Sequence, residues 1–115
     1  MVERFEGSTA YRASKGRFGG PVRLVEYRRT VSTSPSVLLS ENPRRLAWTI
    51  CNRTSQGGAI GFDRSLTYGN GLFLSADGGS VSMEVDVDGE AVGYAVYGVV
   101  ETGSGTWYVW EVYSV

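Results

Sequence analysis

The residues best suited to chemistry are four acidic side chains within one short stretch. Glu84, Asp86, Asp88 and Glu90 are separated by apolar residues or Gly. A pair of carboxylates on one strand face could act as the acid and base of a glycosidase if a substrate cleft lay over them. Alternatively, the carboxylates around residues 86–90 could hold calcium at low affinity, although the stretch lacks the length and the later bidentate Glu of a 12-residue calcium loop. We favour a plainer interpretation, a solvated strand face and an acidic hairpin, and predict no metal site.

The chain contains no histidine, which removes the commonest general base near neutral pH and the commonest metal-binding imidazole. Zinc sites and His-activated nucleophiles are therefore excluded. The phosphate-binding, dinucleotide-binding and nucleophile-elbow motifs do not occur either. The single cysteine, Cys51, lies in an apolar alternating run, where we expect a small buried residue. These features predict a protein that is not an enzyme and needs no cofactor.

Aromatic residues gather near the end of the chain. Trp107 and Tyr113 share one face of a predicted strand, whereas Tyr108 and Trp110 share the other. Because both faces are aromatic, at least one must belong to the core or to an interface. The alternative is a carbohydrate-binding platform for host adhesion, built around Trp107 and Trp110. The preceding predicted strand adds two further aromatics, Tyr94 and Tyr97.

Charge is segregated along the chain. Residues 1–30 carry seven basic and three acidic groups, a net charge of +4, whereas residues 31–115 carry −5. Arg64 is the last basic residue. Copies of one subunit that lay a positive arm on a neighbour's negative face would use this split directly. Arg dominates the basic set, which suits subunit contacts or nucleic acid, but the overall charge of −1 makes nucleic acid an unexpected partner.

Residues 1–21 have no helical or strand periodicity and form a predicted basic, extended N-terminal arm, with a frayed terminus as the alternative. Deletion of residues 2–20 should leave the fold intact and abolish attachment to the particle or oligomerisation. The start of the chain has acids where a secretory signal needs an apolar core, and we find no uncharged apolar run of 18 residues. We therefore expect synthesis in the cytosol and no membrane partner.

The predicted subunit interface comprises Arg4, Phe5, Tyr11, Arg12, Lys15, Arg17 and Phe18 of the arm and Glu84, Asp86 and Asp88 of a neighbouring copy.

Residues 22–115 are predicted to form one all-β domain, because short runs of Val, Ile, Tyr and Trp are separated by Gly, Asn, Asp, Ser and Pro. Residues 45–52 are apolar on both faces and should form a central strand. Residues 91–100 carry no charge and should be covered on both sides, with Gly93 and Gly98 relieving crowding or marking bulges. This pattern predicts an antiparallel β-sandwich of jelly-roll type. The predicted strands are 22–31, 36–40, 45–52, 59–62, 72–75, 80–87, 91–100 and 106–114.

Pro43 should fix a turn before the strand that begins at residue 45, because proline cannot donate to a sheet. Arg44 and Arg45 then lie near the start of this strand. We expect them to meet carboxylates from Glu41 or from another copy.

Parts of the chain resemble small structural proteins of tailed bacteriophages and related viruses. In these proteins a Leu-x-x-x-Asn-x-x-Arg stretch leads into an alternating strand ending in Asn, then an Ile-Gly strand and an Asn-Gly turn before Leu. The corresponding elements here are residues 39–52, 59–62 and 70–74. The resemblance implies a β-sandwich that decorates a capsid or builds a head or turret component in many copies. It implies no ligand-binding residues.

Sequence and resemblance together predict a virion structural protein, a capsid decoration or minor capsid component held by its basic arm. Its expected partners are the major capsid protein or other virion subunits, and copies of itself, with a trimer as one option.

Overall fold

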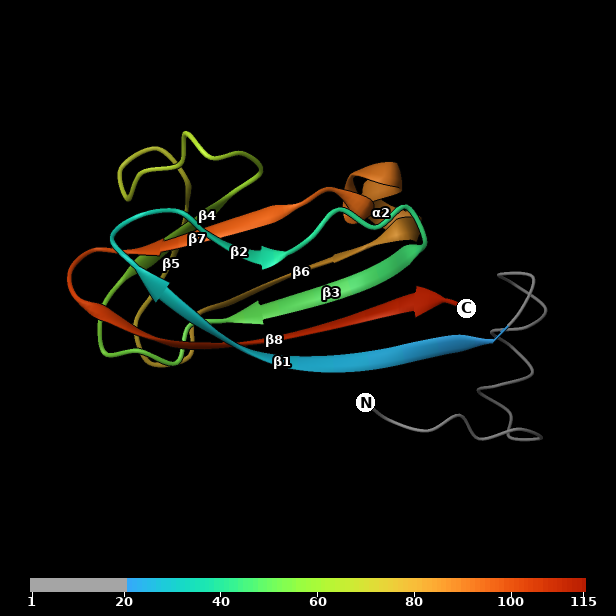
Figure 1. Cartoon of the computed structure of the whole chain (residues 1–115), viewed down its shortest axis with the longest axis horizontal. Helices are drawn as coiled ribbons and strands as arrows, with labels where there is room; N and C mark the ends of the chain where they lie inside the picture. The colour runs from blue at the N-terminus through green and yellow to red at the C-terminus, as the bar shows by residue number, and fades with distance from the viewer. Residues whose placement is uncertain (1–20) are drawn as a thin grey trace.

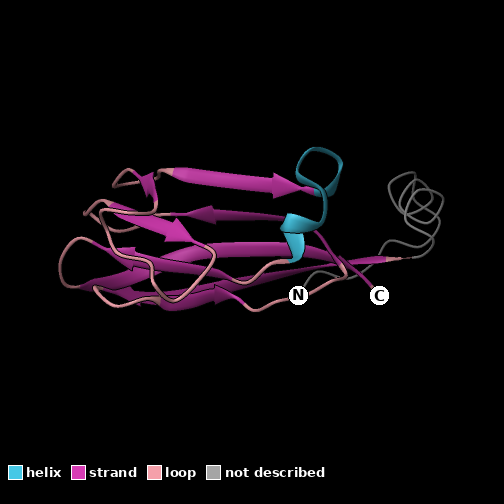
Figure 2. Cartoon of the chain, turned by 90° about the horizontal axis from the view of Figure 1, so that it is seen from above, coloured by secondary structure: helices cyan, strands magenta, loops and turns pink. Residues whose placement is uncertain are grey.

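The structure is a computed structural model that describes residues 21–115. Two four-stranded sheets pack face to face, and two short helical segments lie at one end of the sandwich (Figures 1 and 2). Apart from Pro21, the predicted arm lies outside the described residues. The strands are β1 (Val22–Ser32), β2 (Ser36–Leu39), β3 (Arg45–Cys51), β4 (Gly58–Gly61), β5 (Leu72–Leu74), β6 (Ser80–Glu84), β7 (Val96–Val100) and β8 (Ser104–Ser114).

The strand order is that of a jelly roll, as predicted. One sheet has the order β1-β8-β3-β6 and the other β2-β7-β4-β5, and every strand pair is antiparallel. Except between β4 and β5, the chain changes sheet at each step, so strands distant in sequence become neighbours. The longest pairing joins β1 to β8, in continuous register from Val22 opposite Ser114 to Ser32 opposite Ser104.

The core lies between the sheets because alternate residues of each strand face inward. Trp48 and Ile50 of β3 and Trp107 and Val109 of β8 are at most 1% exposed. Full burial of an aliphatic side chain such as that of Ile50 or Val109 contributes about 1.5–3 kcal/mol to stability. The partners of these residues from the other strands and the neighbouring turn include Val31, Leu38, Leu39, Ile60, Leu74, Val92, Val96 and Val100.

Two glycines of the opposite sheet make room for the Trp107 indole. A β-carbon at Gly58 would lie 2.3 Å from Cζ2 of Trp107, and one at Gly98 would lie 3.0 Å from Cζ3. The ring therefore packs directly against backbone. The prediction that Gly98 relieves crowding in a strand covered on both sides is confirmed, because Val96, Gly98, Val99 and Val100 of β7 are all buried.

Residues 85–93 are helical, so the predicted strands 80–87 and 91–100 are wrong over this stretch. Strand β6 ends at Glu84, followed by one α-helical turn, α2 (Val85–Asp88), and a 3-10 segment, η1 (Gly89–Gly93). The cause is the loss of a partner: the last β6 residue paired with β3 is Glu84, opposite Ala47. Val85 still packs against the core, but Val87, which the alternation placed on the buried face, is 76% exposed.

The two ends of the described chain meet. The backbone N–H of Val115 donates to the carbonyl oxygen of Pro21 at 3.1 Å. This contact lies at the same end of the sandwich as α2 (Figure 1). Neither α2 nor η1 is long and apolar enough to cross a membrane, and these are the helical segments of residues 21–115.

Candidate functional site

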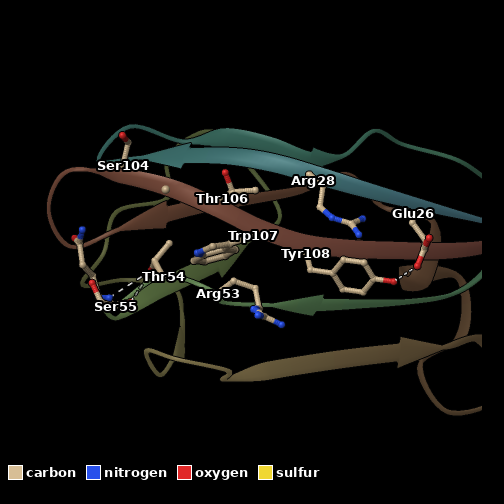
Figure 3. Close-up of a pocket in the computed structure, with 11 residues that line it drawn as sticks. Glu26, Arg28, Arg53, Thr54, Ser55, Ser104, Thr106, Trp107 and Tyr108 are labelled. Carbon is tan, nitrogen blue, oxygen red and sulfur yellow. Dashed lines mark hydrogen bonds between the residues drawn. The ribbon is translucent and has the colours of Figure 1, made fainter.

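A shallow groove of about 830 Å³ lies on the outer face of the β1-β8-β3-β6 sheet (Figure 3). Strand periodicity explains its lining. Inward-facing β1 residues join the core, so Glu26 and Arg28 point outward, as do Thr106 and Tyr108 of β8. Arg28 lies opposite Tyr108 in register. The remaining wall is the loop after β3, which carries Arg53. We call this the Arg28–Arg53 groove.

Three charged or aromatic side chains form one contact group in the groove. The Tyr108 hydroxyl donates a hydrogen bond to Oε1 of Glu26, and the Arg28 guanidinium lies 4.8 Å from the centre of the Tyr108 ring. The hydrogen bond to Glu26 raises the pKa of Tyr108 above its ordinary value. The phenol therefore stays protonated near neutral pH and acts as a fixed donor rather than as a base.

The loop that carries Arg53 is held from beneath. The fully buried Asn52 donates from Nδ2 to the carbonyl oxygens of Gln56, at 2.8 Å, and Leu74, at 3.2 Å. Thr54 donates its hydroxyl proton to Oδ1 of Asn52 at 2.7 Å. Arg53 itself is exposed beside the groove (Figure 3). A loop fixed at Asn52 and Thr54 presents it from a rigid support.

We call Glu84, Asp86 and Asp88, the acidic residues of the predicted interface, the acidic strip. They belong to the end of β6 and to α2, which lie at the opposite end of the sandwich from the β7–β8 turn (Figure 1). Glu84 ends β6 and is exposed, and Oδ2 of Asp88 accepts the backbone N–H of Glu84 at 2.9 Å. Asp86 lies in α2 between them. Within residues 21–115 no group of three or more His, Cys, Asp or Glu side chains could hold a metal ion. The predicted arm residues that would meet this strip, from Arg4 to Phe18, lie outside the described residues.

The aromatic residues have divided roles. Trp107 is fully buried, so it cannot provide a stacking platform, whereas Trp110 and Tyr108 are half-buried on the outer face. Tyr94 is 46% exposed, and its ring centre lies 6.3 Å from that of Phe62 in an edge-to-face contact. Cys51 is half-buried opposite Tyr108, not buried as expected.

Sequence reasoning missed a buried ion pair. We expected Arg45 to meet Glu41 or another copy, but its Nε donates to Oε1 of Glu111 at 3.0 Å, and both side chains are buried. The available signal was Glu111 itself, an acid on a strand face shared with Trp107 and Val109. Its partner is 66 residues away in sequence, so the pairing could not be predicted locally.

A bare apolar edge was also missed. Leu72 and Phe73 of β5 are 55% and 58% exposed, and the Tyr68 ring lies against Phe73 with centres 6.3 Å apart. We call these three residues the β5 edge. Its sequence contains only ordinary strand formers, and their exposure depends on β5 being an outer strand.

No protein-family model matches the chain. No curated protein matches it either. Among solved structures, the chain is similar to one from the work "Bacillus endospore appendages form a novel family of disulfide-linked pili". The alignment has a TM-score of 0.48 and 9% identity, and it covers 82% of this chain and 87% of that one.

Proposed function

We propose that this protein is a non-catalytic structural subunit that acts in many copies, of the type that decorates or builds a virion. The observation that supports assembly is the β5 edge. Leu72 and Phe73 are adjacent, so their side chains point to opposite faces of the strand, yet both are more than half exposed. Leu74, the third residue of β5, is buried, so the exposed apolar surface is confined to Leu72 and Phe73 at the start of the strand. Contact with another subunit would remove this surface from water.

The backbone of β5 adds to this argument. The strand is hydrogen-bonded to β4 on one side and forms the outer strand of its sheet. Monomeric proteins commonly protect such edges by keeping the strand short or by placing charged residues or proline on it. β5 is short, with three residues, but contains no charged residue and no proline. A neighbouring chain could cover both the apolar side chains and the free backbone groups. Enrichment in aromatic residues is also typical of the central part of protein interfaces.

The virion assignment rests on separate support. The jelly roll is a recurring architecture of viral capsid proteins, although lectins and cupins also use it. The sequence resemblance to small phage structural proteins favours the first of these. The proposed arm contact would bring the cationic residues Arg4, Arg12, Lys15 and Arg17 to Glu84, Asp86 and Asp88 of a neighbour.

Mass measurement of the full chain and of a double variant, Leu72→Ser with Phe73→Ser, tests assembly through the β5 edge. Light scattering after gel filtration and native mass spectrometry should find the parent chain in several copies at about 10–100 µM. The double variant should have a smaller assembly mass than the parent chain. Val37→Ser is the matched control, since Val37 is 37% exposed on β2, the outer strand at the other border of the same sheet.

The variants must first keep the circular dichroism spectrum of the parent chain, so that a smaller mass reports lost contacts and not unfolding. A parent chain that stays monomeric throughout this concentration range, or a double variant that assembles like the parent, would refute the β5 edge as an interface.

A further inference from the structure

The Arg28–Arg53 groove contains two arginines that form no ion pair with any residue between 21 and 115. Within the described part of the chain, residues 21–115, the single ion pair is that between Arg45 and Glu111. Arg28 contacts the Tyr108 ring, and the Arg53 guanidinium makes no hydrogen bond to a described residue. The charged residues that line the groove are Arg28, Arg53 and Glu26, two basic and one acidic. Residues 21–115 carry seven basic and ten acidic groups, so a positive groove lies on a domain of net charge −3. Exposed guanidinium groups suit a carboxylate ligand, and these two line opposite sides of Tyr108.

The groove also offers hydroxyl groups. Ser104 and Thr106 of β8 and Ser55 of the β3–β4 loop line it, and all three residues are exposed. Their hydroxyls make no hydrogen bond with another residue of the 21–115 domain. We propose that the Arg28–Arg53 groove binds a saccharide that carries a carboxylate. This inference goes beyond the proposed assembly function, because the groove and the β5 edge lie on different sheets.

The position of Glu26 determines the orientation of the ligand in the groove. Glu26 and Arg28 line the β1 side, whereas Arg53 lies on the other side of Tyr108 (Figure 3). A ligand carboxylate is repelled by Glu26 and therefore pairs with Arg53, where a planar two-bond contact is available. Oε2 of Glu26 then accepts a sugar hydroxyl, while Oε1 already accepts the Tyr108 hydroxyl.

An acidic peptide fits the groove less well. Extended peptides gain affinity by pairing their backbone with a free strand edge. Strand β8, which carries Thr106 and Tyr108, is already paired with β1 and β3. A saccharide needs only side-chain donors and acceptors, which this sheet face provides. A polynucleotide is disfavoured, because it requires many phosphate contacts and two arginines on an acidic domain supply few.

The test is a titration of the full chain with defined sugars, followed by NMR of backbone and arginine side-chain N–H groups. The carboxylated probes are sialyllactose and trigalacturonate, and lactose and galactotriose are the neutral controls. We expect saturable shifts at Arg28, Arg53 and Tyr108 with a carboxylated probe and none with the neutral sugars. A peptide copying residues 80–93 tests the acidic-peptide alternative.

Arg53→Gln should weaken binding of the carboxylated probe by about tenfold or more. Arg53→Lys should be intermediate, because it keeps the charge and loses the planar fork. Arg44→Gln, which removes an exposed arginine far from the groove, should bind like the parent chain. The proposal is overturned if neither acidic sugar, at about 10 mM, changes the chemical shifts. Equal binding of neutral sugars, tighter binding of the peptide, or an unaffected Arg53→Gln variant would do so as well.

Discussion

Arg45 and Glu111 are 66 residues apart in sequence, and their side chains meet at 3.0 Å inside the end of the sandwich. The Arg45 guanidinium also donates to the carbonyl oxygens of Ser40, Val92 and Tyr94. One side chain of β3 thus holds β8, the segment after β2 and the η1 region together. Glu111 is satisfied at both oxygens, because Oε2 accepts the Tyr27 hydroxyl at 2.6 Å.

Replacing Arg45 with Ala should destabilise the fold by about 3–5 kcal/mol, because Glu111 is left buried without its cation. Urea unfolding followed by circular dichroism gives the free energy of unfolding. The control is Arg44→Ala, an exposed neighbour that should cost no more than about 0.5 kcal/mol. Equal losses in the two variants would contradict a structural role for the buried pair.

Stability should fall at high pH because of Tyr27. Burial, followed by the hydrogen bond to Glu111, raises the pKa of Tyr27 to about 12, against 10.0 for an ordinary tyrosine. Above pH 10 the unfolded chain loses the phenol proton while the folded chain keeps it, so the free energy of unfolding declines with rising pH. This contribution is complete below pH 10 and is lost by about pH 12.

Urea midpoints measured between these pH values test the Tyr27 prediction, and the Tyr27→Phe variant is the comparison. The variant should lose about 1–2 kcal/mol at neutral pH, because Glu111 loses a donor. Its decline at alkaline pH should also be shallower than that of the parent chain. A parallel decline would assign the pH dependence to other groups.

Adding a methyl group at Gly58 should overpack the core. The new β-carbon of Gly58→Ala would lie 2.3 Å from the Trp107 ring and 2.8 Å from the Val99 carbonyl oxygen, and neither neighbour can withdraw freely. We expect a loss of about 1–3 kcal/mol in the free energy of unfolding. Gly69→Ala, where nothing lies within 4 Å, is the matched control and should be nearly neutral. A stable Gly58→Ala protein would mean that the Trp107 ring shifts easily.

Removing residues 2–20 should leave the sandwich folded, because the core residues come from residues 31–109. The shortened chain should keep the thermal unfolding midpoint of the parent within a few degrees. It should also lose any association that about 1 M salt weakens, because such salt screens charge pairs. Light scattering at low and high salt measures both effects. Association of the shortened chain that equals that of the full chain would eliminate the arm as an assembly element.

The all-β class could be predicted from the sequence because it depends on local signals. Alternating apolar residues and turn residues mark strands without knowledge of their partners, and six predicted strands, such as β1 and β3, have ends within two residues of the observed ones. The error at Val85 and Val87 shows the limit. Their alternation is that of a strand, but β6 stops where the β3 ladder ends at Ala47, and no local signal marks this position.

The groove and the β5 edge escaped sequence analysis for a similar reason. Arg28 and Arg53 line the same groove only because β8 lies between β1 and β3. The exposure of Leu72 and Phe73 depends on their place at the border of a sheet. Pairing partners and sheet borders are set by the whole topology, so sequence pattern alone indicated neither feature.

The hydrogen bond between Val115 and Pro21 brings the first and last described residues to one pole of the molecule. Strand β1 runs from this pole to Ser32, beside the turn at Ser104 that borders the groove. Pro21 and Val115 therefore lie at the end of the sandwich opposite Ser104. A subunit held by the Pro21 end would present Ser104 and the neighbouring mouth of the groove outward, away from its support.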